Sequence, residues 1–214
     1  NEPSIEVNNS LETFTIPMTE AESAVIKKEF YDVNGDTKQQ EASLVVYNNT
    51  YQPNTGIDYA MKDGKGFDVT ASMSGKVKSV QEDALLGNLV VIEHDKGIET
   101  HYSSVKDIKV KEGDTIKQGE TFAKGGTSAI NEEAGTHVHF EVRKDDVAVN
   151  PLEYLDKPIS SLKAEKTEAD TKAKDSADQE KEETTENQDD AGNETSDDSN
   201  ENQESDPNQE PGNE

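Results

Sequence analysis

Cysteine and tryptophan are absent from this chain of 214 residues, aromatic residues make up only 5% of it, and 21 basic residues face 47 acidic ones. Without cysteine the chain forms no disulfide and offers a metal only His, Asp and Glu. Nucleic acid is excluded as a partner, because phosphate binding needs clustered Lys and Arg. No apolar run approaches the roughly 20 residues that span a bilayer, although a removed segment ahead of Asn1 would leave no trace.

Charge and polarity divide the chain into parts. The net charge of -26 and a mean hydropathy of -0.97 are too polar for one compact domain of this length. From Lys163 to Glu214 there are 19 acidic residues, five lysines and no aromatic residue, so this segment cannot offset the entropy cost of ordering. We therefore expect an extension over residues 1–42, a folded domain over 43–158, and a disordered acidic tail over 159–214.

The extension is expected to contain one short helix. Thr19 followed by Glu22 matches a capping box, and the apolar residues between Ala21 and Phe30 are spaced as on one helix face. Asn34-Gly35 then predicts a turn, after which strands are expected.

The folded domain is expected to be mainly β. Short β-rich runs alternate with turns rich in Gly, Asn and Asp, as in an antiparallel sheet. Turns are predicted at residues 95–97, 111–114 and 117–120, and Leu152, Tyr154 and Leu155 are expected to pack the chain end onto the sheet. The predicted strands are 44–47, 56–60, 67–71, 75–80, 88–94, 98–102 and 136–143.

Histidine is the residue type that most suggests chemistry. His137-Val138-His139 lies in a predicted strand, so the two imidazoles share a face while Val138 and Phe140 point into the core. That arrangement suits a zinc ligand beside a proton-transfer group, although two solvated histidines would fit the same spacing. Asp58 could add a carboxylate ligand, or it could be only a turn residue whose side chain hydrogen-bonds its own backbone.

The order of motifs in the folded domain resembles the LytM-type (M23, lysostaphin-like) zinc endopeptidases. It begins with Gly56-Ile57-Asp58-Tyr59-Ala60, continues through the glycine-centred turns and Gly125-Gly126-Thr127, and ends with His137-Val138-His139-Phe140-Glu141 and Asn150-Pro151. The resemblance covers Leu44 to Leu155. It implies that Asp58 and His139 match zinc ligands and that His137 matches a catalytic histidine.

Two positions depart from that family's pattern. Asn54 stands where the resemblance implies the remaining ligand histidine, and Ser104 stands where it implies the second catalytic histidine. Catalytic zinc needs three protein ligands, and an amide is a weak donor compared with imidazole. We therefore expect no bound metal, no cofactor and no catalysis. His101, three residues before Ser104, is expected on the opposite sheet face, and His94 is expected as a solvated turn residue.

The resemblance is greatest to site-deficient stage II sporulation members of this family, from endospore-forming bacilli. It implies a single-pass anchor in the forespore membrane, a domain in the intermembrane space, and binding to stage III sporulation protein AH from the opposite membrane. Such a link is expected to belong to a channel or secretion-like complex that supports engulfment, with a higher-order ring as a further possibility.

The partner is expected to bind at a sheet edge, because the unpaired N–H and C=O groups of an edge strand can pair with an added strand. The hairpin from Gly87 to Tyr102, with Leu89 and His101, is the expected interface.

Two other functions stay open at this point. One is a zinc endopeptidase of peptidoglycan whose ligands include His101. The other is an activator of a separate cell-wall amidase.

Overall fold

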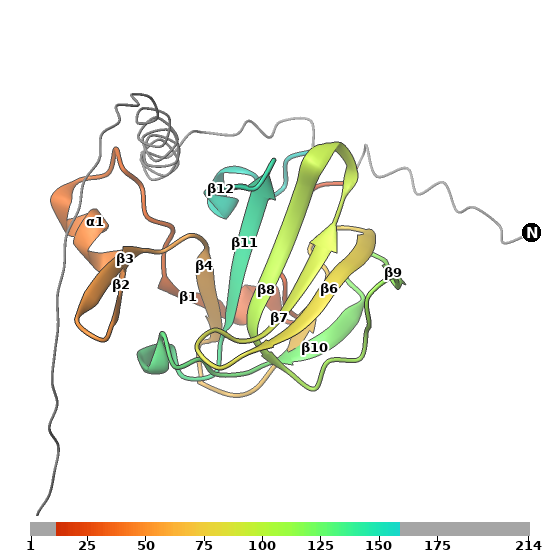
Figure 1. Ribbon diagram of the computed structural model, residues 1–214, viewed down its shortest axis with the longest axis horizontal. Helices are drawn as coiled ribbons and strands as arrows, with labels where there is room; N and C mark the ends of the chain where they lie inside the picture. Colours follow the sequence, from red (N-terminus) through yellow and green to blue (C-terminus); the bar gives the residue numbers. More distant parts are fainter. Residues whose placement is uncertain (1–11, 159–214) are drawn as a thin grey trace, which may run out of the picture. The chain divides into compact units, whose positions relative to one another are not determined.

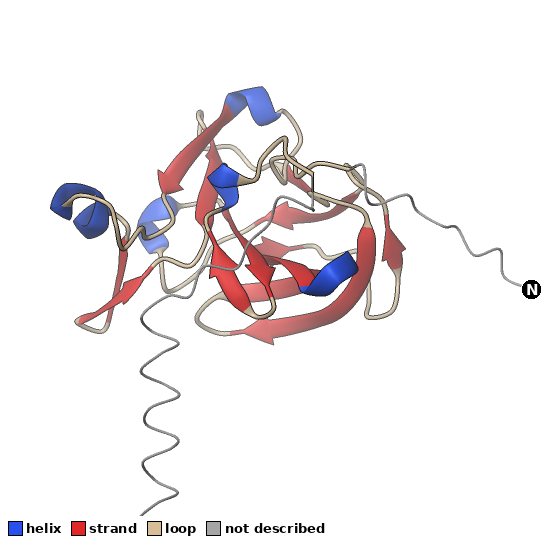
Figure 2. Cartoon of the chain, turned by 90° about the horizontal axis from the view of Figure 1, so that it is seen from above, coloured by secondary structure: helices blue, strands red, loops and turns tan. Residues whose placement is uncertain are grey.

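β-strands dominate residues 12–158, which are the residues described by this computed structural model (Figures 1 and 2). The regular elements, in chain order, are η2 (Ala21–Ser23), β1 (Ala24–Lys28), α1 (Thr37–Ala42), β2 (Leu44–Tyr47), β3 (Thr50–Pro53), β4 (Ile57–Met61), β5 (Asp68–Thr70), β6 (Gly75–Asp83), β7 (Gly87–Glu93), η3 (Asp95–Gly97), β8 (Ile98–Lys106), β9 (Thr115–Ile116), β10 (Thr121–Gly125), η4 (Glu132–Ala134), β11 (Val138–Lys144), β12 (Val147–Val149) and η5 (Pro151–Glu153). Within this part of the chain no helix is long and apolar enough to cross a membrane.

One large antiparallel sheet carries the fold. Its main path runs β1-β4-β11-β8-β7-β6-β9, with β10 paired to β5 and β8, and β12 paired to β11. The hairpin β2–β3 forms a separate two-stranded sheet, which Figure 1 shows on the side of β4. The mainly β, antiparallel fold expected from the sequence is therefore confirmed.

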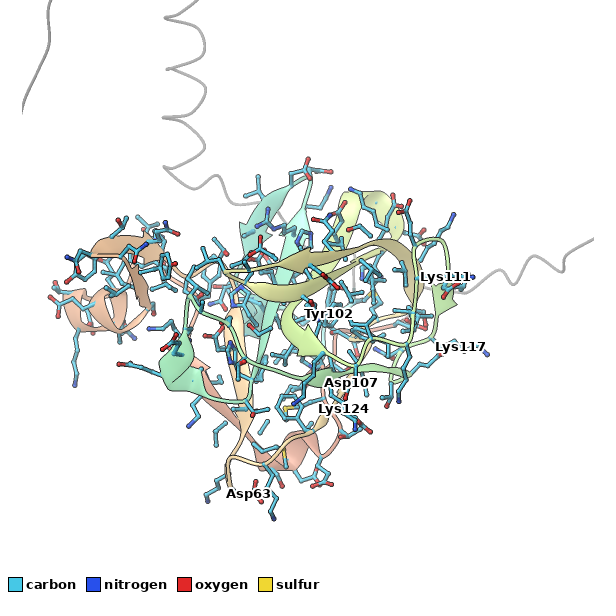
Figure 3. All side chains as sticks on the ribbon, turned by 60° about the horizontal axis from the view of Figure 1, so that its bottom comes forward. Asp63, Tyr102, Asp107, Lys111, Lys117 and Lys124 are labelled. Carbon is cyan, nitrogen blue, oxygen red and sulfur yellow. The ribbon has the colours of Figure 1, made fainter. Side chains whose placement is uncertain are left out.

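The core lies under the centre of the sheet, where alternating residues of neighbouring strands point inward. Val138, Phe140 and Val142 of β11 are all buried, as the alternation of a strand predicts. The ring of Tyr102 lies 5.0 Å from that of Phe122 and 5.3 Å from that of Phe140. Figure 3 shows Tyr102 within the body of the domain, and Lys111 and Lys117 project at one margin.

The expected strands all have counterparts in the structure. The prediction for residues 44–47 matches β2, and the other six predictions overlap β4, β5, β6, β7, β8 and β11. The strands β1, β3, β9, β10 and β12 were not predicted. The tail over residues 159–214 and the polar start of the chain lie outside the described residues.

The helix expected around Ala21 to Phe30 is a wrong prediction. Only Ala21–Ser23 form a short 3-10 turn, and Ala24–Lys28 pair with β4 as an edge strand, with Val25 opposite Ala60. The apolar residues do have helical spacing, but the segment adopts the strand conformation because it pairs with the edge of the sheet at β4.

Within residues 12–158 the one α-helix lies further on, at Thr37–Ala42. The Asp36 carboxylate accepts a hydrogen bond from the backbone N–H of Gln39, and the Gln39 side chain accepts one from the backbone N–H of Asp36, which completes a capping box. At the far end of the domain, Tyr154 is buried as expected, but Leu152 is 41% exposed and does not pack on the sheet.

Candidate functional site

A cavity of about 250 Å³ opens between the β2–β3 hairpin, the strands β4, β8 and β11, and the loop ahead of β11. All five positions that the family resemblance singled out line it: Asn54, Asp58, Ser104, His137 and His139. A larger cavity of about 460 Å³, beside Phe67 and Lys124, contains none of them. The sequence-predicted site therefore comes together in one place.

His139 is held between two carboxylates. Strand register places it directly opposite Asp58, whose Oδ1 lies 2.6 Å from His139 Nδ1. On the other side of the ring, Nε2 lies 3.1 Å from Oε1 of Glu141, two residues further along the same strand. Asn131 donates a hydrogen bond to Oδ2 of Asp58, so both oxygens of that carboxylate are engaged.

The two carboxylates keep His139 positively charged. Burial by itself would lower the pKa of this imidazole, but the hydrogen bonds and charges of Asp58 and Glu141 outweigh burial and raise the pKa to about 10. Burial would raise the pKa of both carboxyl groups, yet the imidazolium lowers it, and at Glu141 the Arg143 guanidinium lowers it further. The floor of the cavity is thus an internally compensated group of charges.

His137 occupies the same strand face but is fully enclosed, with 1% of its surface exposed. Its Nδ1 donates to the carbonyl oxygen of Gly135 at 2.9 Å, and its Nε2 lies 3.4 Å from Oγ of Ser128. Neither histidine of the pair is the freely solvated strand residue that the spacing also allowed.

The side-chain nitrogen of Asn54 is hydrogen-bonded to the backbone. Its side chain is buried, and Nδ2 donates to the backbone carbonyls of Glu29 at 3.0 Å and Gly56 at 2.8 Å. The amide therefore ties the end of the β1 segment to the start of β4.

Ser104 lies at an irregular point of β8. It adopts a left-handed backbone with φ of 60°, and its Oγ donates to the carbonyl of Leu86 at 3.2 Å. The pairing of β7 with β8 shifts register here, with Asn88 opposite Val105 but Val90 opposite Tyr102. A bulge of this kind interrupts the alternation of faces.

The bulge overturns the expected orientation of His101. In register, His101 lies opposite Glu141, and Ser103 lies opposite His139, so His101 is on the same sheet face as the cavity residues. Its Nε2 is 2.9 Å from Oε2 of Glu99, and its Nδ1 is 4.0 Å from Oε2 of Glu141. His101 nevertheless lies outside the cavity lining, beyond Glu141.

Two further expectations need correction. The hairpin with Leu89 and His101 was expected at a sheet edge, but β7 pairs with both β6 and β8, and β8 pairs with both β7 and β11. His94 is buried, with Nδ1 2.9 Å from the Ser74 carbonyl oxygen and Nε2 2.8 Å from Thr100 Oγ1. Burial lowers its pKa.

Sequence reasoning overlooked Glu141, Arg143, Asn131 and Ser128, which surround the two histidines. Glu141 and Arg143 could have been found, since they continue the strand face of His137 and His139 at intervals of two. Asn131 and Ser128 come from a loop and carried no such signal. Across residues 12–158, no group of three or more His, Asp or Glu side chains is arranged to hold a metal ion.

Comparison with known proteins places this geometry in a family. The sequence profile described as peptidase family M23 matches residues 52–151. Stage II sporulation protein Q of Bacillus subtilis (strain 168) is 44% identical over 168 residues, which are 78% of this chain and 59% of that protein. The chain thus spans about three fifths of that relative's length.

Two solved structures show the same relationship. A chain in the structure of the SpoIIQ-SpoIIIAH pore forming complex is 44% identical, with a TM-score of 0.71, and the match covers 74% of this chain and 100% of that one. A chain in the crystal structure of the SpoIIIAH and SpoIIQ complex, also 44% identical, has a TM-score of 0.64 with 65% and 98% covered. The protein therefore belongs to the stage II sporulation protein Q family, which has the fold of peptidase family M23.

Proposed function

We propose that this protein is a non-catalytic M23-fold scaffold of endospore formation that binds stage III sporulation protein AH. Its similarity to SpoIIQ, found in structures together with SpoIIIAH, supports the partner. The domain would face the space between the forespore and mother-cell membranes, anchored in the forespore membrane by a single N-terminal span. The link would form part of a channel or secretion-like complex that supports engulfment.

The observation that carries the non-catalytic part is the hydrogen bonding of Asn54. We infer that Asn54 replaces a ligand histidine. Its Nδ2 is taken up by two backbone carbonyls, and its amide oxygen is a weak metal donor compared with an imidazole nitrogen. Asp58 and His139 are then the only two remnants of a ligand set. Catalytic zinc takes three protein ligands, so the residues present do not fit this metal.

The second proposed loss concerns proton transfer. We infer that Ser104 replaces a catalytic histidine, because it lines the cavity on the strand next to β11. A hydroxyl does not titrate near neutral pH and cannot stand in for an imidazole as acid or base. His137, the remnant catalytic residue, lies beside Ser128, and the only other histidine lining the cavity is His139, the remnant ligand.

Restoring the missing imidazoles tests this assignment. The chain as it stands is expected to retain no zinc after purification and to leave cross-linked muropeptides intact. Asn54→His together with Ser104→His is expected to bind zinc near one equivalent, with Asn34→His as a control at an exposed asparagine outside the cavity. Tight zinc binding by the unaltered chain would contradict the proposal and favour an endopeptidase.

The position of the partner interface needs a separate experiment. Leu89 and His101 remain the proposed contact residues, now on a sheet face and not at an edge. Leu89→Glu and His101→Glu are expected to weaken binding of stage III sporulation protein AH at least tenfold, which corresponds to about 1.4 kcal/mol. Unchanged affinity with both variants would move the interface elsewhere. Stimulation of an amidase in a mixed assay, without partner binding, would instead favour an activator.

A further inference from the structure

The β2–β3 hairpin presents large apolar side chains to solvent. Val46 is 54% exposed, Tyr47 is 37% exposed and Tyr51 is 67% exposed. These are three of the seven exposed large hydrophobic residues in the described part of the chain, and all three lie within a few residues of one turn. Such a concentration on one small element is typical of an interaction surface.

The hairpin also offers unpaired backbone. β3 pairs with β2, and within residues 12–158 no other strand pairs with either of them. All four residues of β3 are exposed. An isolated two-stranded hairpin is only marginally stable in water. Pro53 has no backbone N–H, so a further strand along the open side of β3 would pair mainly with the outward backbone groups around Tyr51.

The turn of the hairpin holds the two strands ready for such pairing. Asn48 and Asn49 both adopt left-handed backbone conformations, with φ of 47° and 60°. Two successive left-handed residues characterise the tight turn whose twist matches that of paired strands, and Asn tolerates this region better than other non-glycine residues. The edge is therefore pre-shaped, which reduces the entropy cost of adding a strand.

The hairpin's own residues carry no charge, although Lys28 donates a hydrogen bond to the Leu44 carbonyl, and Glu132 and Glu133 line a cavity beside Val46. From Ala42 to Ile57 the sequence contains no Asp, Glu, Lys, Arg or His, and no other run without these residues is as long. The chain as a whole carries a net charge of -26. Two copies of so acidic a protein repel each other wherever carboxylates meet, and an uncharged surface is where that repulsion is least.

We propose that the hairpin is a self-association site, at which β3 pairs edge to edge with β3 of a second copy of this chain. A basic partner would be matched by acidic residues, which the hairpin itself lacks. A second copy of this acidic chain is better matched by an uncharged strand, because no carboxylates then face each other. The contact is small, so the association is weak in solution and depends on local concentration. This inference does not rest on partner binding or on the loss of catalysis.

Single cysteines test the contact directly, because the chain has none of its own. Gln52→Cys places a thiol on β3, and Val80→Cys places one on β6 at a site that is 37% exposed. With a short bismaleimide cross-linker at equal protein concentration, Gln52→Cys is expected to give a several-fold higher yield of cross-linked dimer. Equal yields from the two variants would overturn the proposal.

A second test measures how salt and an added charge change the dimer yield. Raising sodium chloride from about 50 to about 500 mM is expected to raise the Gln52→Cys dimer yield, since salt screens the repulsion between the two chains. Adding Tyr51→Lys, at a side chain exposed enough not to affect folding, is expected to lower the yield several-fold, with circular dichroism as the check on folding.

Two outcomes would assign the edge differently. A dimer yield that falls as salt rises would show an electrostatic contact and contradict pairing through an uncharged surface. If Tyr51→Lys leaves dimerisation unchanged but abolishes binding of stage III sporulation protein AH, the edge belongs to that partner and the self-association proposal fails.

Discussion

At the scale of single residues, Asn54 connects three segments of the chain through hydrogen bonds. Its Nδ2 bonds the carbonyl oxygens of Glu29 and Gly56, and its backbone N–H donates to the Ser43 carbonyl at 3.0 Å. Three segments therefore meet at one amide. A histidine that served as a ligand would have one ring N–H left, so it could bond at most one of those two carbonyls.

Asn54→Ala tests this structural role. The substitution removes two hydrogen bonds and leaves backbone carbonyls unsatisfied, so the free energy of unfolding is expected to fall by about 1–3 kcal/mol. Urea denaturation measures the change. Asn34→Ala, at an exposed asparagine, serves as the control and is expected to stay within about 0.5 kcal/mol of the unaltered protein. Equal stability of the two variants would show that the Asn54 contacts contribute nothing.

His94 gives a prediction about pH. Burial lowers the pKa of its imidazole below the ordinary value of 6.5, so the unfolded chain binds this proton more readily than the folded chain does. The neutral ring therefore stabilises the fold above about pH 6.5, and this contribution is lost as the pH falls below that value.

Replacement of this residue isolates its contribution. Between pH 7 and pH 5, the unaltered protein is expected to lose more unfolding free energy than His94→Gln, which has no group to titrate at that position. Denaturation curves of both proteins at both pH values measure this difference. The carboxylates are the same in the two proteins, so their contribution to the pH dependence cancels. Parallel losses would contradict a buried neutral His94.

At the scale of elements, β4 and β11 approach closely at Gly56. A Cβ added to Gly56 would lie 2.4 Å from the backbone oxygen of Phe140, which cannot move without disturbing β11. Gly66 has open space around the same position. The glycine is therefore required where β4 begins, next to His139.

Gly56→Ala is accordingly expected to reduce the unfolding free energy by roughly 1–3 kcal/mol or more through overpacking. Gly66→Ala is the matched control and is expected to leave stability close to that of the unaltered protein. Thermal unfolding of the two variants measures both. A Gly56→Ala variant as stable as the control would show that β4 and β11 can separate at no cost.

The sequence predicted some elements of this fold and missed others. Short β-rich runs predicted β2 and β11, and with β11 the shared face of His137 and His139. The segment Ala24–Lys28 satisfied helical spacing, yet its place at a sheet edge made it a strand. The capping pair Asp36 and Gln39 was a readable signal for α1, and it was overlooked.

The candidate site was predictable to a similar extent. The order of motifs singled out five residues, and the structure places all of them in one cavity: Asn54, Asp58, Ser104, His137 and His139. The bulge at Ser104 was not predictable, because left-handed backbone at a serine leaves no pattern in the sequence. Without the bulge, counting residues put His101 on the wrong sheet face.

At the scale of the whole molecule, the sheet of an M23 fold carries a cavity whose polar residues are bonded within the protein. The sheet and its core position Asn54 and the compensated group of Asp58, His139 and Glu141, whose side chains make internal hydrogen bonds. Fold and activity are separable, since a site can be lost while its framework persists. A fold of this kind can therefore serve binding, as proposed above.

The central claim is that this protein binds stage III sporulation protein AH without metal chemistry. Calorimetric titration of the purified chain with the soluble domain of that protein, with and without a chelator, tests it most directly. The account predicts saturable binding near one to one, with the same affinity in both conditions. Absence of binding, or binding that disappears with the chelator, would contradict it.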